Sequence, residues 1–181
     1  YALQLRVLSA SSPAGTTWAL KSPSHLGHLD ALLGALPDAT VVVCHRDPRE
    51  AVASYASLIH ALRRPYAVDA DPAVAGRQAL ERAAVAMGRA LDVRARAGGA
   101  FVDVSYPQLE RDPVGAVRGV YAAMGRPVTP ELEAAMAAWA ASNPRHRHGP
   151  HRYDLARFRL DEAEVLDAFA AYLDQYGALV G

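Results

Sequence analysis

The chain has 181 residues, of which 51% are hydrophobic, and its 19 basic and 19 acidic side chains give a formal net charge of zero. This length can bury one sizeable core, so we expect a single domain over residues 1–181. A neutral chain gives no sign of nucleic acid or an anionic membrane as a partner. No apolar run approaches the roughly 20 residues of a membrane helix, and no basic-then-apolar leader precedes the domain, so we expect a cytoplasmic protein without a membrane partner.

The cysteine content and the start of the chain indicate its context. The single cysteine, Cys44, excludes an intrachain disulfide framework, which fits a reducing cytosol. It lies within an expected buried strand, where we interpret it as a packing residue. The chain opens at Tyr1, without an initiator Met, inside an expected amphipathic helix over residues 1–10. We therefore expect this sequence to be the later part of a longer polypeptide.

The first β-α unit is expected over residues 17–37. Residues 17–21 read as a short strand that ends at Lys21. Ser22 and Pro23 then match the N-cap and first position of a helix, which we expect to end at Pro37. A helix N-terminus supplies free N–H groups and a partial positive charge, so an anion beside Lys21 would be stabilised there. The simpler interpretation of Lys21 is the exposed end of a strand.

The second β-α unit follows directly. The β-branched run at residues 40–45 predicts a buried strand, and Asp47 with Pro48 predicts the start of a helix in which Glu50 completes a capping box. Two such units in succession imply parallel strands joined by right-handed crossovers. Lys21 and Arg46 would then lie at the same edge of one sheet, where α/β proteins bind ligands.

The rest of the chain predicts one further strand and several helices. The strand is expected at residues 100–105, with residues 106–109 forming a turn behind it. Helices are expected at residues 71–97, 112–125, 129–143 and 161–177, the last with Glu164 as capping-box partner of Asp161. Trp18 and Trp139 are expected in the core. The predicted fold is α/β, a P-loop-like parallel sheet flanked by helices, present only in its later part.

Arg46 is the first candidate for an anion site. It stands at the carboxyl end of a strand beside a helix N-terminus, which is where α/β proteins bind phosphate. Ser54 lies about two turns into that helix, on the face of Asp47 and Glu50, so its hydroxyl can assist if the ligand reaches along the helix. The alternative is a structural arginine and an ordinary helical serine.

A basic loop late in the chain is the second candidate. Three arginines and three histidines surround Gly149 and Pro150, with no acidic residue among them. These basic residues are Arg145, His146, Arg147, His148, His151 and Arg152. This density of donors in a neutral chain indicates a local anion, although charge runs are often only solvated surface. Together with Lys21 and Arg46, this loop gives three separate basic sites, which suit a ligand with several phosphate-like groups.

Four segments, taken together and in order, resemble the PAPS-dependent sulfotransferase family. The resemblance is to the bacterial branch with a W-x-L-K-S-P strand, and it covers nearly the whole chain. The segments are WALKSPSHL at residues 18–26, HRDP at residues 45–48 with Ser54, VSYPQLERDP at residues 104–113, and HGPHRY at residues 148–153.

The resemblance implies a binding role for several residues. Arg46 and Ser54 match the residues that hold the 3′-phosphate of PAPS. Tyr106 would lie near the adenine, although Pro107 and Gln108 replace the acidic pair of the family motif. The late basic loop matches a loop over the same phosphate and the nucleotide, which makes cofactor-binding candidates of Arg147, His148, Gly149, His151 and Arg152.

The resemblance also implies catalytic roles. Lys21 matches the lysine near the transferred sulfuryl group. His25 stands close to the position of the family's catalytic histidine, with Pro23 and Ser24 intervening, and is a candidate general base. The family's 5′-phosphosulfate loop is expected upstream of Tyr1, and turnover is expected only with that segment. Residues 15–18 imitate the end of such a loop, but no Lys or Arg precedes them and residues 17–18 are assigned to the strand.

The expected reaction is therefore transfer of a sulfuryl group from PAPS to a hydroxyl or amine of a small-molecule or carbohydrate acceptor. One alternative is a nucleotide-dependent phosphotransferase, although the chain has no G-x-x-x-x-G-K-[ST] motif and no obvious Mg²⁺ carboxylate. Another is a non-catalytic nucleotide or anion-binding module. We expect no metal site, because the histidine pairs lack cysteine or acidic partners. His45 and His60 are interpreted as structural.

Overall fold

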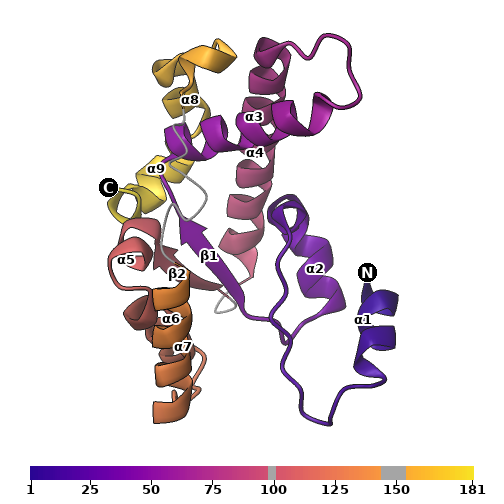
Figure 1. Cartoon of the computed structure of the whole chain (residues 1–181), viewed down its shortest axis with the longest axis vertical. Helices are drawn as coiled ribbons and strands as arrows, with labels where there is room; N and C mark the ends of the chain where they lie inside the picture. Colours follow the sequence, from indigo (N-terminus) through magenta and orange to yellow (C-terminus); the bar gives the residue numbers. More distant parts are fainter. Residues whose placement is uncertain (98–100, 144–153) are drawn as a thin grey trace.

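The computed structural model describes residues 1–97, 101–143 and 154–181, and Figure 1 shows their arrangement. In chain order, the elements, with η for 3₁₀ helices, are α1 (Ala2–Ser9), η1 (Pro23–His28), α2 (Leu29–Ala35), β1 (Val41–His45), α3 (Pro48–Arg63), α4 (Pro72–Arg96), β2 (Phe101–Ser105), α5 (Tyr106–Arg111), α6 (Pro113–Ala123), α7 (Pro130–Ser142), η2 (Ala156–Phe158), α8 (Glu162–Ala168), α9 (Ala170–Tyr176) and η3 (Gly177–Leu179). Among the described residues, no helix is both long enough and apolar enough to cross a bilayer.

Strands β1 and β2 form a parallel pair, which confirms the predicted α/β class. The register pairs Val41 with Phe101 at one end and His45 with Ser105 at the other. Helices α3 and α4 make the crossover between the strands, as parallel pairing requires. Because both strands end at the same level, the residues that follow them, Arg46 and Tyr106, meet at the carboxyl edge of the sheet.

Most predicted helix starts are confirmed, but both predicted capping boxes are wrong. The side chains of the predicted N-cap residues accept hydrogen bonds from backbone N–H groups of the first turn, as expected for Asp and Thr at this position. These N-cap residues are Asp47, Asp71, Asp112, Thr129 and Asp161. Glu50 and Glu164 do not complete these boxes. Each carboxylate instead makes an ion pair with an arginine, Glu50 with Arg46 and Glu164 with Arg77, because a guanidinium offers a stronger charge-assisted bond.

The strand expected at residues 17–21 is wrong. No strand is assigned there, and residues 16–22 run as an exposed, irregular segment in which Trp18 is 41% exposed. A strand needs a neighbour to pair with, and β1 pairs with β2 within the described part of the chain. The Thr17 hydroxyl instead accepts a hydrogen bond from Arg126 at 2.9 Å.

Other expectations need smaller corrections. The helix predicted after Ser22 is split into η1 and α2, and the last helix is broken at Phe169 into α8 and α9. The turn predicted after β2 is helix α5, for which Ser105 is the N-cap. Trp139 is 68% exposed on α7, not in the core.

One face of β1 is open, so Cys44 is not the packing residue that we expected. Cys44 is exposed and Val42 is 43% exposed, whereas His45 on the opposite face is buried. Side chains alternate between the two faces of a strand. At β1, the described helices therefore cover the face on which His45 lies and leave Val42 and Cys44 exposed.

The main core lies between α3, α4 and the C-terminal helices. Its buried residues are Val52, Ala56, Ile59, Ala75, Ala79, Leu80, Phe158, Leu160, Val165, Phe169 and Tyr172. A second, smaller cluster of Leu29, Ala90 and Val93 joins α2 to the C-terminal half of α4. Helix α4 thus links both clusters, which makes it the central support behind the sheet edge that carries Arg46.

Candidate functional site: the carboxyl edge of the parallel strands

Arg46 and Tyr106 come together at the carboxyl edge of β1 and β2. The Arg46 guanidinium lies over the Tyr106 ring, with its central carbon 4.6 Å from the ring centroid. Its Nε and Nη2 donate hydrogen bonds of 3.0 and 2.9 Å to Oε2 of Glu50. The ring and the carboxylate therefore fix the direction of a side chain that is only 20% exposed.

Ser54 lies on the same side of α3 as Glu50. The two residues are four positions apart, which places their side chains one above the other on a helix. Ser54 is half-buried, so Arg46, Glu50 and Ser54 follow one line along the start of α3. The predicted partnership of Arg46 and Ser54 at a phosphate stays a prediction.

A polar cluster around the buried His45 supports this edge from behind. His45 is 1% exposed, its Nε2 lies 2.7 Å from Oδ1 of Asp103, and its Nδ1 lies 3.1 Å from the Tyr172 hydroxyl. Arg94 also donates to Asp103, at 2.7 Å for Nη1. Partial burial opposes ionisation of Asp103, but the hydrogen bonds from Arg94 and His45 outweigh it and hold its pKa below the ordinary value. His45 is thus structural, as predicted, and so is His60, which bonds the carbonyl of Ala70.

We expect acid to destabilise the fold partly through Asp103 and Asp47. Hydrogen bonding to Arg49 lowers the pKa of Asp47, as Arg94 and His45 do for Asp103. A folded-state pKa below the unfolded value of about 3.9 stabilises the fold above that pH, and the contribution is lost as the pH falls through the folded pKa. Urea unfolding below about pH 4 should show a declining free energy of unfolding. The decline should be shallower in Asp103→Asn, and an equal decline would contradict this role.

Lys21 and His25 lie on another segment of the chain. Lys21 is exposed in the irregular stretch before η1, and half-buried His25 meets the ring of Tyr1 edge-on at 5.4 Å between centroids. In Figure 1, β2 and α5 lie on one side of β1 and α2 on the other. The predicted delivery of Lys21 to the sheet by its own strand is therefore wrong. The predicted roles of Lys21 and His25 near the sulfuryl group stay predictions.

The late basic loop falls outside the described residues. This applies to the candidates Arg147, His148, Gly149, His151 and Arg152. No group of three or more His, Cys, Asp or Glu side chains suited to a metal ion is found in the part of the chain that is described.

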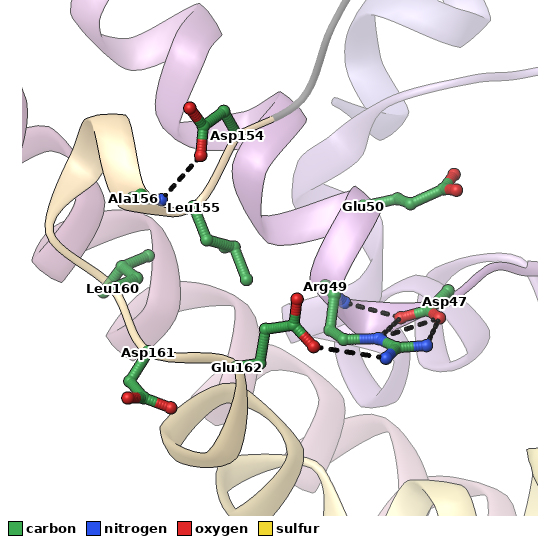
Figure 2. Close-up of a pocket in the computed structure, with 9 residues that line it drawn as sticks. All are labelled: Asp47, Arg49, Glu50, Asp154, Leu155, Ala156, Leu160, Asp161 and Glu162. Carbon is green, nitrogen blue, oxygen red and sulfur yellow. Dashed lines mark hydrogen bonds and ion pairs between the residues drawn. The ribbon is translucent and has the colours of Figure 1, made fainter.

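An acidic hollow lies next to the start of α3, and Figure 2 shows its lining. It measures about 520 Å³, and its carboxylates are Asp47, Glu50, Asp154, Asp161 and Glu162. Arg49 is held inside it by Asp47 and by Glu162, the latter at 3.4 Å, which ties α3 to α8. The lining carries five carboxylates and one guanidinium, so this hollow does not fit a phosphate.

A second hollow of about 530 Å³ lies between η1, α3 and α4. Its wall is largely apolar, with Leu26, Ala83 and Ala86 among the residues, while Tyr55, His28 and Arg82 supply polar groups. It borders the segment that carries His25. The sequence patterns did not predict it, because the wall is assembled from separate elements.

Glu50, Asp103 and Tyr172 belong to the environment of Arg46 but were not among the predicted site residues. Glu50 carried a signal, since a carboxylate four residues after an arginine can pair with it on a helix. Asp103 and Tyr172 carried none, because they lie 58 and 127 residues from His45 along the chain.

Comparison with known proteins identifies the family. A model of the sulfotransferase family matches residues 2–130. Sulfotransferase STF9 from Mycobacterium avium is 33% identical over 94% of this chain and 44% of that one, with a TM-score of 0.85. Sulfotransferase STF1 from Mycobacterium tuberculosis H37Rv is 31% identical over 86% of this chain and 40% of that one, with a TM-score of 0.71.

The chain spans less than half the length of either solved structure. A search of curated proteins gave no match. The family model covers well over half of the chain and the fold agrees with both mycobacterial enzymes, so the chain belongs to the sulfotransferase family.

Proposed function

We propose that this chain supplies the 3′-phosphate site of a PAPS-dependent sulfotransferase. The observation that carries the proposal is the Arg46 guanidinium, oriented by Glu50 and by the Tyr106 ring at the carboxyl edge of two parallel strands. A planar guanidinium matches the oxygens of a phosphate group in pairs. The carboxyl edge of a parallel sheet is where folds of this class bind nucleotides.

The residues present suit the nucleotide half of PAPS. Helix α3 has 16 residues and starts two positions after Arg46, so its dipole favours an anion at this edge. The charge of Asp47 at the same helix end is balanced by Arg49. Arg46 and Ser54 would hold the 3′-phosphate, with Tyr106 close to the adenine, and the late basic loop is proposed to add further cations.

PAPS supplies the activated sulfuryl group, and the acceptor is proposed to be a hydroxyl or amine of a small molecule or carbohydrate. Lys21 would neutralise charge near the transferred group, and a base must take the acceptor proton. By analogy with phosphoryl transfer, positioning and electrostatics would supply most of the rate enhancement. The hollow between η1 and α4 is our candidate for the acceptor side, because it borders the segment of Lys21 and His25.

His25 is the proposed general base. We expect His25→Ala to lower the turnover number strongly while the affinity for adenosine 3′,5′-bisphosphate, the desulfated product, stays unchanged, since a base acts on the acceptor and not on the nucleotide. Near-normal turnover of His25→Ala in a sulfuryl-transfer assay would remove His25 from the mechanism.

Calorimetry of the protein with adenosine 3′,5′-bisphosphate tests the proposed function. We expect binding at micromolar concentrations and much weaker binding of 5′-AMP, which lacks the 3′-phosphate. The absence of binding would contradict the proposal. Equal binding of ATP, with a Mg²⁺ requirement, would instead favour the phosphotransferase. Binding without sulfuryl transfer in the full-length polypeptide would favour a non-catalytic module.

A further inference from the structure

The end of β1, directly before Arg46, is held from behind by the hydrogen bonds of a buried histidine. Nδ1 of His45 lies 3.1 Å from the Tyr172 hydroxyl, and Nε2 lies 2.7 Å from Oδ1 of Asp103. Tyr172 is 3% exposed and His45 is 1% exposed. A continuous chain of hydrogen bonds therefore runs from Tyr172 through His45, the residue before Arg46, to Asp103.

The chemistry of the groups sets the direction of the bond to Asp103. An ionised Asp103 can only accept, so Nε2 of His45 donates to it. Nδ1 of His45 and the Tyr172 hydroxyl share the second bond. Burial raises the pKa of Tyr172 to about 12, so this hydroxyl keeps its proton at neutral pH. Arg94 fixes the far end of the chain by binding Asp103.

The position of these bonds links them to the site. Strand β1 ends at His45, where its register with Ser105 closes the ladder, so Arg46 is the first residue beyond the sheet. Its backbone sets the point from which the guanidinium reaches Glu50 and Tyr106. Tyr172 comes from α9, which Figure 1 shows beside the carboxyl end of β1.

We propose that Tyr172 is a positioning residue, which acts through His45 and the backbone of Arg46 to align the guanidinium for the 3′-phosphate. The inference rests on the proposed function of Arg46. Stacking on His45 is common to Tyr172 and Tyr176, so stacking alone does not explain why Tyr172 also hydrogen-bonds His45. The Tyr176 ring stacks on His45 with centroids 4.7 Å apart, but its hydroxyl is not a member of the chain of hydrogen bonds.

Tyr172→Phe and Tyr176→Phe form a matched pair to test this inference. Each removes one hydroxyl from a ring of α9 that stacks on His45. The readout is the ratio of the two dissociation constants, for 5′-AMP and for adenosine 3′,5′-bisphosphate, from calorimetry. We expect Tyr172→Phe to reduce this ratio about three- to tenfold, the effect of one hydrogen bond, and Tyr176→Phe to leave it unchanged. A purely structural role would lower the melting temperature without changing the ratio.

The outcomes separate this inference from the proposed function. If Arg46→Ala reduces the ratio but a folded Tyr172→Phe does not, the inference is wrong and the proposed function stands. If Arg46→Ala also leaves the ratio unchanged, the proposed function fails and the inference fails with it. If Tyr172→Phe does not fold, Asp103→Asn tests the hydrogen bond on the other side of His45. This variant keeps an acceptor for Nε2 of His45 but removes the negative charge of the carboxylate. We expect a smaller reduction of the ratio there, and an unchanged ratio overturns the inference.

Discussion

Arg46→Ala is expected to weaken adenosine 3′,5′-bisphosphate about 30-fold or more while 5′-AMP is much less affected. Truncating one partner of a largely buried, hydrogen-bonded charge pair costs about 2–5 kcal/mol, and each 1.4 kcal/mol is tenfold in affinity. The Arg46 side chain is only 20% exposed, so water cannot replace it fully. Calorimetric titration with both nucleotides measures the effect. Equal losses for the two would mean that Arg46 has only a structural role.

Arg77 provides the matched control for charge. It is an arginine of α4 that pairs with Glu164 of α8 and not with a residue at the start of α3. Arg77→Ala should change the affinities for the two nucleotides by similar factors. Arg46→Lys should fall between alanine and the unchanged protein, because lysine keeps the charge but loses the paired donors of the guanidinium. An equally selective loss in Arg77→Ala would show that any lost positive charge weakens the binding, which would contradict a specific contact of Arg46 with the 3′-phosphate.

The local elements could be predicted because their signals are local. Asp47, Asp71 and Asp112 each stand before a proline, and each caps the helix that was expected there. The β-branched run before His45 forms β1, and the run at residues 101–105 forms β2. Helix caps and short apolar strands depend on residues only a few positions apart, so they can be predicted from the sequence alone.

The pairing of distant segments could not be predicted in the same way. Order along the chain suggested that the segment of Lys21 lies beside the strand of Arg46, but that neighbour is β2. The family resemblance placed both Arg46 and Tyr106 at the nucleotide, but their contact with each other was not predicted. The exposure of Trp139 and of Cys44 depends on which elements cover them. His45 was recognised as structural, but its partners Asp103 and Tyr172 come together only in the fold.

The two glycines of α4 are expected to respond to alanine with opposite signs. Gly88 is exposed, and a Cβ there meets no heavy atom within 4 Å. Gly88→Ala should therefore stabilise the protein by up to about 1 kcal/mol, since alanine is the better helix former. Gly76 is buried, and its Cβ would lie 2.4 Å from the Phe158 carbonyl oxygen and 2.8 Å from the Phe158 Cβ. Backbone cannot move aside as a flexible side chain does, so Gly76→Ala should destabilise the protein.

The size of the Gly76 effect follows from the position of Phe158. Overpacking of a core costs typically about 1–3 kcal/mol, which exceeds the gain of about 1 kcal/mol in helix propensity. Phe158 is 2% exposed in the main core, and Arg159 after it has a positive φ of 53°, so the segment has little room to shift. Urea unfolding of both variants measures the difference. A stabilised Gly76→Ala would show that η2 does not pack against α4 as closely as described. The C-terminal helices that place Tyr172 against His45 would then lack this contact as a support.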